Sequence, residues 1–364
     1  MTRETPPAIE ARIGDRGYPV HLDSGILASL GERWVAGATG EAVLLVHDAN
    51  VTAIAMRAEE SLAAAGIRVV SAPVPPGESS KSLAELERLA RLAATAGLRR
   101  RDGVVAVGGG VIGDLAGFLA ASYQRGVRLA HVPTTLLAMV DSAIGGKAGV
   151  DIPEGKNYVG AIWQPELVLI DTDVLDTLPA RELASGFAEV VKYGLLDGPE
   201  LFELVESWPA LPGPRDRLRE LILRCVTHKI DVVADDEHDH GRRASLNLGH
   251  TVAHGIEAAL GYAGVTHGEA VAVGLMPMLR LSEELCGLDP SWRIRTGEVL
   301  ARHGLPTRLE GVVAVDDVLA AAARDKKSDG RSLNMVLIDA PGSIRLGVDP
   351  PPRMLRDAVA EVLA

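Results

Sequence analysis

The sequence is poor in aromatic residues and nearly lacks cysteine. Phe, Trp and Tyr make up 3% of its 364 residues, which leaves little material for the stacked-ring platforms that hold single-stranded nucleic acid. Its two cysteines, Cys225 and Cys286, follow no metal-ligand or redox spacing and lie in apolar, helix-like segments. We therefore expect two buried, reduced thiols, which are usual in a reducing compartment.

Long apolar runs and an excess of positive charge are also missing. No stretch approaches the roughly 18 uncharged apolar residues of a spanning helix, and residues 1–15 lack the apolar core of a signal peptide. Asp and Glu number 49 against 37 Lys and Arg, a formal charge of −12, which disfavours general binding to nucleic acid. The sequence predicts a cytoplasmic protein with no membrane and no nucleic-acid partner.

What the sequence does contain is an ordinary globular composition with 39 glycines, an excess typical of tight turns or of backbone that lies against a ligand. From about residue 40 to 175, short β-branched runs alternate with helix-like segments, which predicts a parallel sheet covered by helices. The expected buried strands are 43–46, 67–70, 104–107 and 167–170, and a helix is expected between Ser80 and Gly97.

After residue 178 the pattern becomes almost entirely helical up to about residue 327. A small hairpin, 335–338 with 344–348, is expected before a last helix. The chain length suits two domains of roughly 150 residues or more each. We therefore predict an α/β domain over residues 1–178 and a mainly helical domain over residues 179–364.

The first candidate ligand site is the glycine-rich segment 108–114, GGGVIGD, between an expected strand and an expected helix. Glycines let the backbone approach an anion, and a helix N-terminus supplies N–H donors, so this order suits a pyrophosphate. The segment lies more than 100 residues into the chain, and no acidic residue ends the next strand, at 131–135. An ordinary dinucleotide-binding turn is therefore doubtful, while a nucleotide site on another α/β layout and a plain tight turn both stay open.

Two further glycine-rich segments carry a lysine each. Lys147 follows Gly145 and Gly146, and Lys156 follows Gly155 nine residues later. Backbone N–H groups and an ammonium group together suit a phosphate. Two surface turns with solvated lysines are the alternative.

In the helical half, four polar residues recur at offsets of 4, 3 and 4: Arg243, Asn247, His250 and His254. This spacing predicts that they share one face of a helix. An ordinary exposed face rarely combines two histidines with Arg and Asn, so the spacing indicates a functional stripe.

A metal site is a second interpretation of the same region. His267 lies 17 residues after His250, and Glu189 shares a face of an upstream helix with Lys192. Two imidazoles and a carboxylate suit an open Zn²⁺ site with room for substrate oxygens, although each residue alone could equally be an ordinary core or surface side chain. The histidines of the charged segment 235–240 are expected to lie in a solvated turn.

Taken in order, these segments resemble the 3-dehydroquinate synthase family over about residues 40–350. The matching segments are GGGVIGD, PTTLLAMVDSAIGGK, GKNYVG, DTLPARE, GFAEVVKYG, DDEHDHGRRASLNLGHTVAHGIE, HGEAVAVG and RDKK. Each is weak alone, but their order and spacing are specific. The resemblance implies an NAD-binding α/β domain with a parallel sheet, a mainly helical C-terminal domain that binds Zn²⁺ or Co²⁺, and a homodimer.

The resemblance also implies a role for each residue at a matching position. The metal ligands would be Glu189, His250 and His267. The cofactor contacts would be Asp48, Glu78, Lys81, Gly110, Val111, Ile112, Gly113, Asp114, Thr134, Thr135, Lys147, Lys156 and Thr177. The catalytic and substrate-binding residues would be Arg125, Asp141, Lys147, Asn157, Lys192, Lys229, Arg243, Asn247, His254 and Lys327, with Lys326 as the alternative to Lys327 and with Arg125 acting within one subunit or across a dimer.

The activity implied is the conversion of 3-deoxy-D-arabino-heptulosonate 7-phosphate to 3-dehydroquinate and phosphate, a step of the shikimate pathway. It proceeds by transient oxidation with NAD⁺, β-elimination of phosphate, reduction and intramolecular aldol closure. Ala143, Asp151 and Asp239 depart from the family's usual residues, at positions that are neither metal ligands nor phosphate contacts. These departures concern the details of substrate binding more than the class of reaction.

Three alternatives stay open. A cyclase acting on sedoheptulose 7-phosphate or glucose 6-phosphate would share cofactor, metal and phosphate, but Arg243 and Asn247 favour a substrate with a carboxylate. A metal-dependent alcohol or glycerol dehydrogenase tends to place a histidine four residues after its first acidic ligand, where this chain has Tyr193. An NAD-binding module without turnover would not need all three metal-ligand candidates.

Overall fold

The computed structural model describes residues 8–14, 16–36, 40–239, 241–327 and 335–363. The chain forms two compact units. Unit 1 comprises Met1–Leu178 and Pro214–His238, and unit 2 comprises Pro179–Gly213 and Asp239–Ala364. The division at residue 178 into a cofactor domain and a metal domain stays a prediction, because compactness assigns no ligand to either unit.

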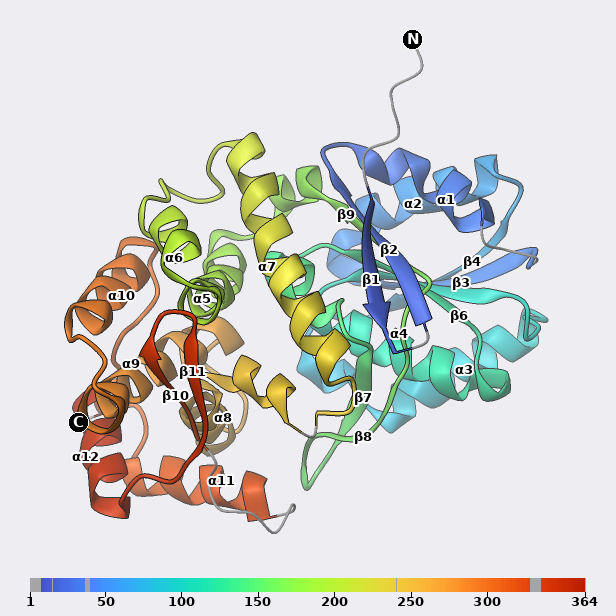
Figure 1. The fold of residues 1–364 in the computed structure, drawn as a ribbon. Helices are drawn as coiled ribbons and strands as arrows, with labels where there is room; N and C mark the ends of the chain where they lie inside the picture. The colour runs from blue at the N-terminus through green and yellow to red at the C-terminus, as the bar shows by residue number, and fades with distance from the viewer. Residues whose placement is uncertain (1–7, 15, 37–39, 240, 328–334, 364) are drawn as a thin grey trace. The chain divides into compact units, whose positions relative to one another are not determined.

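Unit 1 is built on a seven-stranded sheet (Figure 1). Its strands are β1 (Ala8–Ile13), β2 (Arg16–Asp23), β3 (Ala42–Asp48), β4 (Arg68–Val74), β5 (Gly103–Gly108), β6 (Arg128–Pro133) and β9 (Leu167–Asp171). They lie in the order β1-β2-β9-β6-β5-β3-β4, and every neighbouring pair is parallel except β1 with β2. The predicted α/β class is therefore confirmed.

Helices cover both faces of this sheet. They are α1 (Leu30–Ala36), α2 (Thr52–Ala64), α3 (Leu83–Thr95), α4 (Gly110–Ser122) and, from later in the chain, α7 (Arg215–Asp235). Helices α3 and α4 pack through a core that includes Leu89, Leu115 and Val104, and Figure 1 shows α1 and α2 on the opposite face. Burial of such apolar side chains is the main force that holds a parallel sheet between helices.

The start of α3 differs from the prediction. Its N-cap is Ser82, whose side chain accepts a hydrogen bond from the N–H of Glu85, while Ser80 belongs to a preceding 3-10 turn. Either serine could cap a helix. The predicted end is correct, because Gly97 has the left-handed conformation (φ 71°) that follows a helix C-terminus.

A separate two-stranded hairpin packs against α4 in unit 1. Strands β7 (Lys147–Ile152) and β8 (Gly155–Ile162) pair antiparallel, after a short π-helical segment, Ala138–Ser142. The connection passes through Gly145 (φ 93°) and Gly146 (φ 68°), whose positive φ angles explain the glycine pair before Lys147.

Unit 2 is mainly helical, as the sequence predicts. Its helices are α5 (Ala180–Asp197), α6 (Pro199–Glu206), α8 (His250–Ala259), α9 (His267–Cys286), α10 (Ser291–Arg302), α11 (Val315–Lys327) and α12 (Pro352–Leu363). The expected hairpin before the last helix is confirmed as β10 (Met335–Ala340) with β11 (Ser343–Val348). Helix α9 begins with a capping box of Thr266 and Glu269, which fixes His267 as its first residue.

The predicted helical stripe of Arg243, Asn247, His250 and His254 is wrong as a continuous helix. Arg243 and Asn247 lie in a 3-10 helix, Arg242–Asn247, while α8 begins only at His250. Only His250 and His254 share a helix face, with ring centroids 5.5 Å apart.

The break at Gly249 has a packing cause. Gly249 is left-handed (φ 83°), and a Cβ atom there would lie 3.1 Å from Cδ2 of Leu275 on α9. A Cβ atom at Gly274 would in turn lie 2.3 Å from the carbonyl oxygen of Gly249. Helix α9 therefore approaches this turn at backbone distance, and this tertiary contact overrides the helical spacing.

Among the described helices, none combines the length and the apolar character needed to cross a membrane. Both cysteines are free thiols. Cys225 is buried, as predicted, whereas Cys286, the last residue of α9, is only partly buried.

Candidate active site

The glycine-rich segment 108–114 forms the connection from β5 to the first turn of α4. A Cβ atom at Gly108 would lie 2.6 Å from Cβ of Ile112, so only glycine lets the helix begin this close to the strand. Cβ atoms at Gly109 and Gly110 would lie 3.0 Å from Cγ2 of Thr135 and 3.3 Å from Oγ of Ser142. Because the first N–H groups of a helix have no partner within it, this close-packed turn suits an anion.

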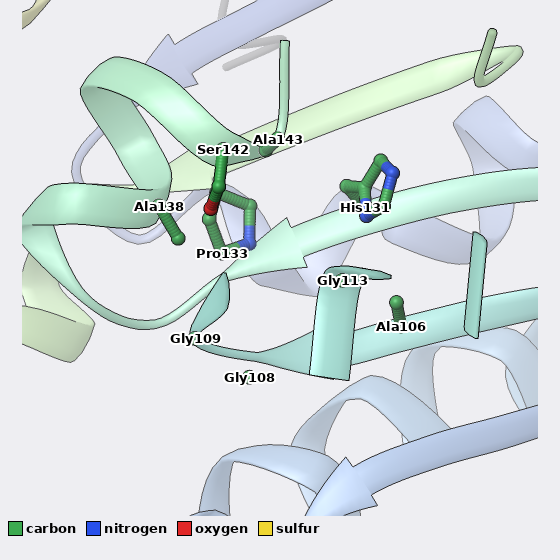
Figure 2. A pocket seen from close by; sticks show the side chains of 9 residues that line it. All are labelled: Ala106, Gly108, Gly109, Gly113, His131, Pro133, Ala138, Ser142 and Ala143. Carbon is green, nitrogen blue, oxygen red and sulfur yellow. The ribbon is translucent and has the colours of Figure 1, made fainter. Parts of the chain in front are cut away.

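A pocket adjoins the turn (Figure 2). It is lined by Ala106, Gly108, Gly109, Gly113, His131, Pro133, Ala138, Ser142 and Ala143. Of the predicted cofactor contacts, Gly113 lines it directly. Ile112 is 1% exposed, so only its backbone is available to a ligand.

Four of the predicted cofactor residues form one charged cluster in unit 1. Lys81 pairs with Asp114 at 2.6 Å and with Glu78 at 3.9 Å, and Lys156 reaches Glu78 at 3.3 Å. Burial lowers the pKa of Lys81, but the attraction of Asp114 and Glu78 outweighs it, and this pKa lies above its usual value. Lys81 is therefore a fixed cation beside the N-terminus of α4.

The β7–β8 hairpin holds two predicted substrate or cofactor residues. Lys147 is its exposed first residue. Asn157 has a left-handed backbone (φ 58°), and its N–H donates to Oδ1 of Asp151 at 2.9 Å. Asp151 in turn donates its N–H to the carbonyl oxygen of Lys81 at 2.8 Å. The hairpin is thus tied to the charged cluster.

Asp141 and Lys229 are brought together although 88 residues separate them. Lys229 on α7 donates to the carbonyl oxygen of Asp141 at 2.6 Å and to its Oδ1 at 2.8 Å. Helix α7 packs against the π-helical segment that carries Asp141. This contact places a nearly buried ammonium group beside the segment that leads to Lys147.

The other predicted residues of unit 1 make local contacts. Thr134 is buried and donates its N–H to the carbonyl oxygen of Gly108, and Thr135 Oγ1 accepts the N–H of Ala138. Asp48 caps a 3-10 turn, Thr177 donates to Val174, and Arg125 is exposed with a left-handed backbone (φ 64°). These contacts neither bring Asp48, Thr177 and Arg125 together nor oppose their predicted roles.

Unit 2 brings the three predicted metal ligands together. Glu189 lies on α5, and His250 and His267 are the first residues of α8 and α9. One ligand atom from each lies within 4.8 Å of the others, and Glu189 Oε1 is 3.4 Å from Nε2 of both histidines. Two imidazoles and a carboxylate at this spacing fit a Zn²⁺ or Co²⁺ ion with open positions.

Each histidine is oriented by a contact through its other ring nitrogen. Nδ1 of His250 lies 3.2 Å from the carbonyl oxygen of Leu248, and Nδ1 of His267 lies 3.4 Å from Oε1 of Glu257. Such partners of Nδ1 direct Nε2 to a metal and are typical of metal sites. The sequence reasoning missed Glu257, although it lies seven residues after His250, two turns along the same helix.

The surroundings shift the two histidines in opposite directions. Burial lowers the pKa of His267, but hydrogen bonds to Glu189 and Glu257 outweigh it and raise this pKa to about 10. Burial, together with the positive charge of Lys192, lowers the pKa of His250 to about 3. Two carboxylates around His267 thus stabilise positive charge at the position where a metal ion would supply it.

Lys192 is paired with Glu189, and both side chains are 1% exposed. The predicted sharing of one helix face by Glu189 and Lys192 is confirmed.

His254 is exposed, with its ring centroid 6.3 Å from that of His267, so it lies at the edge of the histidine cluster. Arg243 is 4% exposed and Asn247 is exposed. Lys327 ends α11, and its side chain and that of Lys326 lie outside the described residues.

Gly268 offers a test of this geometry that replaces none of the three ligand residues. Its N–H donates to Oγ of Ser185 at 3.0 Å, and a Cβ atom there would lie 1.9 Å from the backbone oxygen of Ser185 on α5. Gly268→Ala is therefore expected to push α9 from α5, separating His267 from Glu189. We expect metal affinity to fall at least about tenfold and stability by about 1–3 kcal/mol, measured by metal titration and thermal unfolding. Unchanged metal affinity would contradict the close approach of α5 and α9.

A parallel-sheet unit whose glycine-rich turn suits an anion, together with a helical unit whose three ligand residues could hold a metal ion, is typical of metal-dependent α/β enzymes. The family model for the N-terminal part of 3-dehydroquinate synthase matches residues 71–185, and that for the C-terminal part matches residues 186–328. The 3-dehydroquinate synthase of Rhodopirellula baltica is 42% identical over 367 residues, which cover 98% of this chain and 97% of that protein. The chain belongs to the 3-dehydroquinate synthase family.

Solved structures agree on the fold. A 2-deoxy-scyllo-inosose synthase complexed with carbaglucose-6-phosphate, NAD⁺ and Co²⁺ has a TM-score of 0.88 and 26% identity, covering 98% of this chain and 100% of that chain. A 2-epi-5-epi-valiolone synthase from Streptomyces hygroscopicus subsp. jinggangensis 5008, with NAD⁺ and Zn²⁺ bound, has a TM-score of 0.84 and 26% identity, covering 96% of this chain and 98% of that chain. Both are less similar in sequence to this chain than the Rhodopirellula enzyme.

Proposed function

We propose that this chain is a carbon–oxygen lyase that converts 3-deoxy-D-arabino-heptulosonate 7-phosphate to 3-dehydroquinate and phosphate. The reaction passes through oxidation, β-elimination, reduction and aldol closure, and it belongs to the shikimate pathway. The observation that carries the proposal is the Glu189, His250 and His267 cluster, in which one ligand atom from each residue lies within 4.8 Å of the others. Membership of the family supports the choice of reaction.

The donor sets fit both expected groups. Glu189, His250 and His267 would hold Zn²⁺ or Co²⁺, which supplies Lewis-acid polarisation of substrate hydroxyl groups when bound. The turn at Gly110–Asp114 would hold NAD⁺, with Glu78 and Lys81 beside it, and this cofactor supplies the hydride acceptor and donor.

The other site residues would bind and orient the substrate. By the family resemblance, Arg125, Asn157, His254 and one of Lys326 and Lys327 would bind the phosphate group of the substrate, and Lys147 and Lys156 would contact both cofactor and substrate. Lys192 is paired with Glu189, a position from which its ammonium group could also donate to a substrate hydroxyl. The Asp141–Lys229 pair fixes the segment before the β7–β8 hairpin. The homodimer, the cytoplasmic location and a role of Arg125 across subunits stay predictions.

Arg243 is the residue that would distinguish a carboxylate-bearing substrate. Its side chain is nearly buried, at 4% exposure, and its guanidinium offers a fork of donors that matches a carboxylate. Arg243→Lys keeps the charge and loses the fork, so KM for the heptulosonate phosphate is expected to rise roughly ten- to a hundredfold. Metal content and affinity for NAD⁺ should stay near those of the wild type.

A purely structural Arg243 would give a different result. In that case Arg243→Lys would lower the melting temperature and leave KM unchanged. Measuring both quantities on this one variant decides between the two roles.

The experiment that tests the proposed function follows phosphate release and absorbance of NADH in one assay. We expect phosphate release to require NAD⁺ while no NADH accumulates, because the hydride returns to the substrate. One equivalent of NADH per turnover would contradict the proposal and favour an alcohol dehydrogenase.

A further inference from the structure

His131 is a buried histidine to which neither the sequence nor the family resemblance assigns a role. It lies on β6, is 7% exposed and lines the pocket beside the first turn of α4 (Figure 2). A Cβ atom at Gly113 would lie 3.6 Å from Cε1 of its ring, so the absence of a side chain at Gly113 lets the imidazole approach the helix.

The ring has polar atoms but no protein partner among the described residues. None of their hydrogen bonds or ion pairs involves His131, in contrast to the buried His47, whose ring nitrogens lie 3.2 Å from Oγ of Ser71 and 3.1 Å from the carbonyl oxygen of Asp48. Burial lowers the pKa of His131 to about 4, so the imidazole is neutral near pH 7 and has one donor and one acceptor. Buried polar groups in proteins are nearly always paired with protein or with water.

Ser142 is the second polar side chain in this pocket (Figure 2). Its Oγ would be 3.3 Å from a Cβ atom at Gly110, so the hydroxyl lies against the start of α4. In the first turn of this helix, Gly110 therefore packs against Ser142, and Gly113 packs against His131. The remaining lining is apolar or backbone, and the pocket has room for about one water molecule.

We propose that His131 and Ser142 bind one buried water molecule beneath the first turn of α4, and that His131 is thereby a positioning residue for the dinucleotide. The water satisfies the imidazole and the hydroxyl and packs against the backbone of Gly109 and Gly113, which line the same pocket. A rigid turn binds pyrophosphate more tightly because its N–H donors need no further ordering. The inference rests on the proposed function, since the ligand of this turn is taken to be NAD⁺.

The test is a double-mutant cycle on NAD⁺ affinity, measured by calorimetry. His131→Leu and Ser142→Ala are each expected to raise Kd for NAD⁺ roughly three- to tenfold. The Kd of the double variant for NAD⁺ should be no higher than the higher of the two single-variant Kd values, because both substitutions remove the same water. His131→Gln, which keeps a polar side chain, should bind NAD⁺ within about twofold of the wild type. If His131→Leu fails to fold, Ser142→Ala and His131→Gln still test the proposal, with the same expected Kd values for NAD⁺.

His21→Leu is the matched control. His21 lies on β2 of the same sheet, is 8% exposed, and its pKa is also lowered to about 4, but its ring contacts Arg33. We expect Kd for NAD⁺ to be unchanged in this variant. A crystal structure should place one water within about 3.2 Å of the His131 ring and of Ser142 Oγ.

The possible failures are distinguishable. A wild-type chain that does not bind NAD⁺ would overturn the proposed function and this inference with it. A wild type that binds NAD⁺, beside variants of His131 and Ser142 that bind equally well, would overturn the inference alone. Additive losses in the double variant would likewise overturn the shared water.

Discussion

Replacing His250 by alanine is expected to lower kcat/KM by about a thousandfold or more, since a lost metal ligand removes several kcal/mol of charge stabilisation. His250 holds its Nε2 3.4 Å from Glu189 Oε1 and is oriented by the carbonyl oxygen of Leu248. With it gone, only Glu189 and His267 remain, too few ligands for a stable site. Bound metal per chain, measured by atomic emission after dialysis, should fall well below that of the wild type.

The matched control is His238→Ala. His238 is exposed, in a turn after α7 of unit 1, and is not among the three ligands. This variant should keep metal and activity near wild-type values. Equal metal content in the wild type and His250→Ala would refute the ligand assignment.

Lys192→Met is expected to lower kcat by about a hundredfold or more, the range of a lost proton donor or acceptor, without removing the metal. Lys192 and Glu189 are both 1% exposed, and their pairing puts an ammonium group beside the metal cluster. Methionine has a similar length and fills the same space, but it carries neither charge nor donors. A bound metal ion would still balance Glu189, so metal content should stay at the wild-type level.

Thermal unfolding provides the control for this variant. Removing one partner of a buried pair leaves an uncompensated charge, which is strongly destabilising. Lys192→Met should therefore melt well below the wild type without metal and recover when Zn²⁺ is added. Full activity in Lys192→Met would exclude a catalytic role, and loss of metal would show that Lys192 is needed for the site itself.

Local patterns predicted the parts of the fold that local physics determines. The buried runs around Val105 and Leu169 became central strands, because a strand covered on both faces must be apolar throughout. The edge pair β1 and β2 was not predicted: it alternates polar and apolar residues and includes Pro19 within β2, so its sequence carries little of this signal.

The site was predictable in its residue types but less so in its geometry. The three metal-ligand candidates lie on three different helices. The periodicity within a single helix therefore cannot predict that the first residues of α8 and α9 lie close to Glu189. The break at Gly249 depends on Gly274, a residue 25 positions later, which is why spacing alone favoured one continuous helix. Glu257 could not be predicted from the sequence, because its role depends on a contact with the ring of His267, which lies on a different helix.

The positions of the lysines along the chain are a further feature of the predicted site. The chain contains only seven lysines, at positions 81, 147, 156, 192, 229, 326 and 327, and all seven lie within residues 71–328, which the two family models match. Other cationic positions are arginine. A compact ammonium group with three rotatable donors differs from a planar guanidinium, so lysine and arginine are not interchangeable at these positions.

We propose that this enzyme eliminates phosphate from a sugar phosphate that carries a carboxylate. The most direct measurement compares initial rates of phosphate release from 3-deoxy-D-arabino-heptulosonate 7-phosphate and from sedoheptulose 7-phosphate, with NAD⁺ and Zn²⁺ or Co²⁺ present. We expect kcat/KM to favour the heptulosonate phosphate by about a hundredfold or more, because a substrate without the carboxylate loses the charged contact with Arg243. Equal rates, or a preference for sedoheptulose 7-phosphate, would contradict the account.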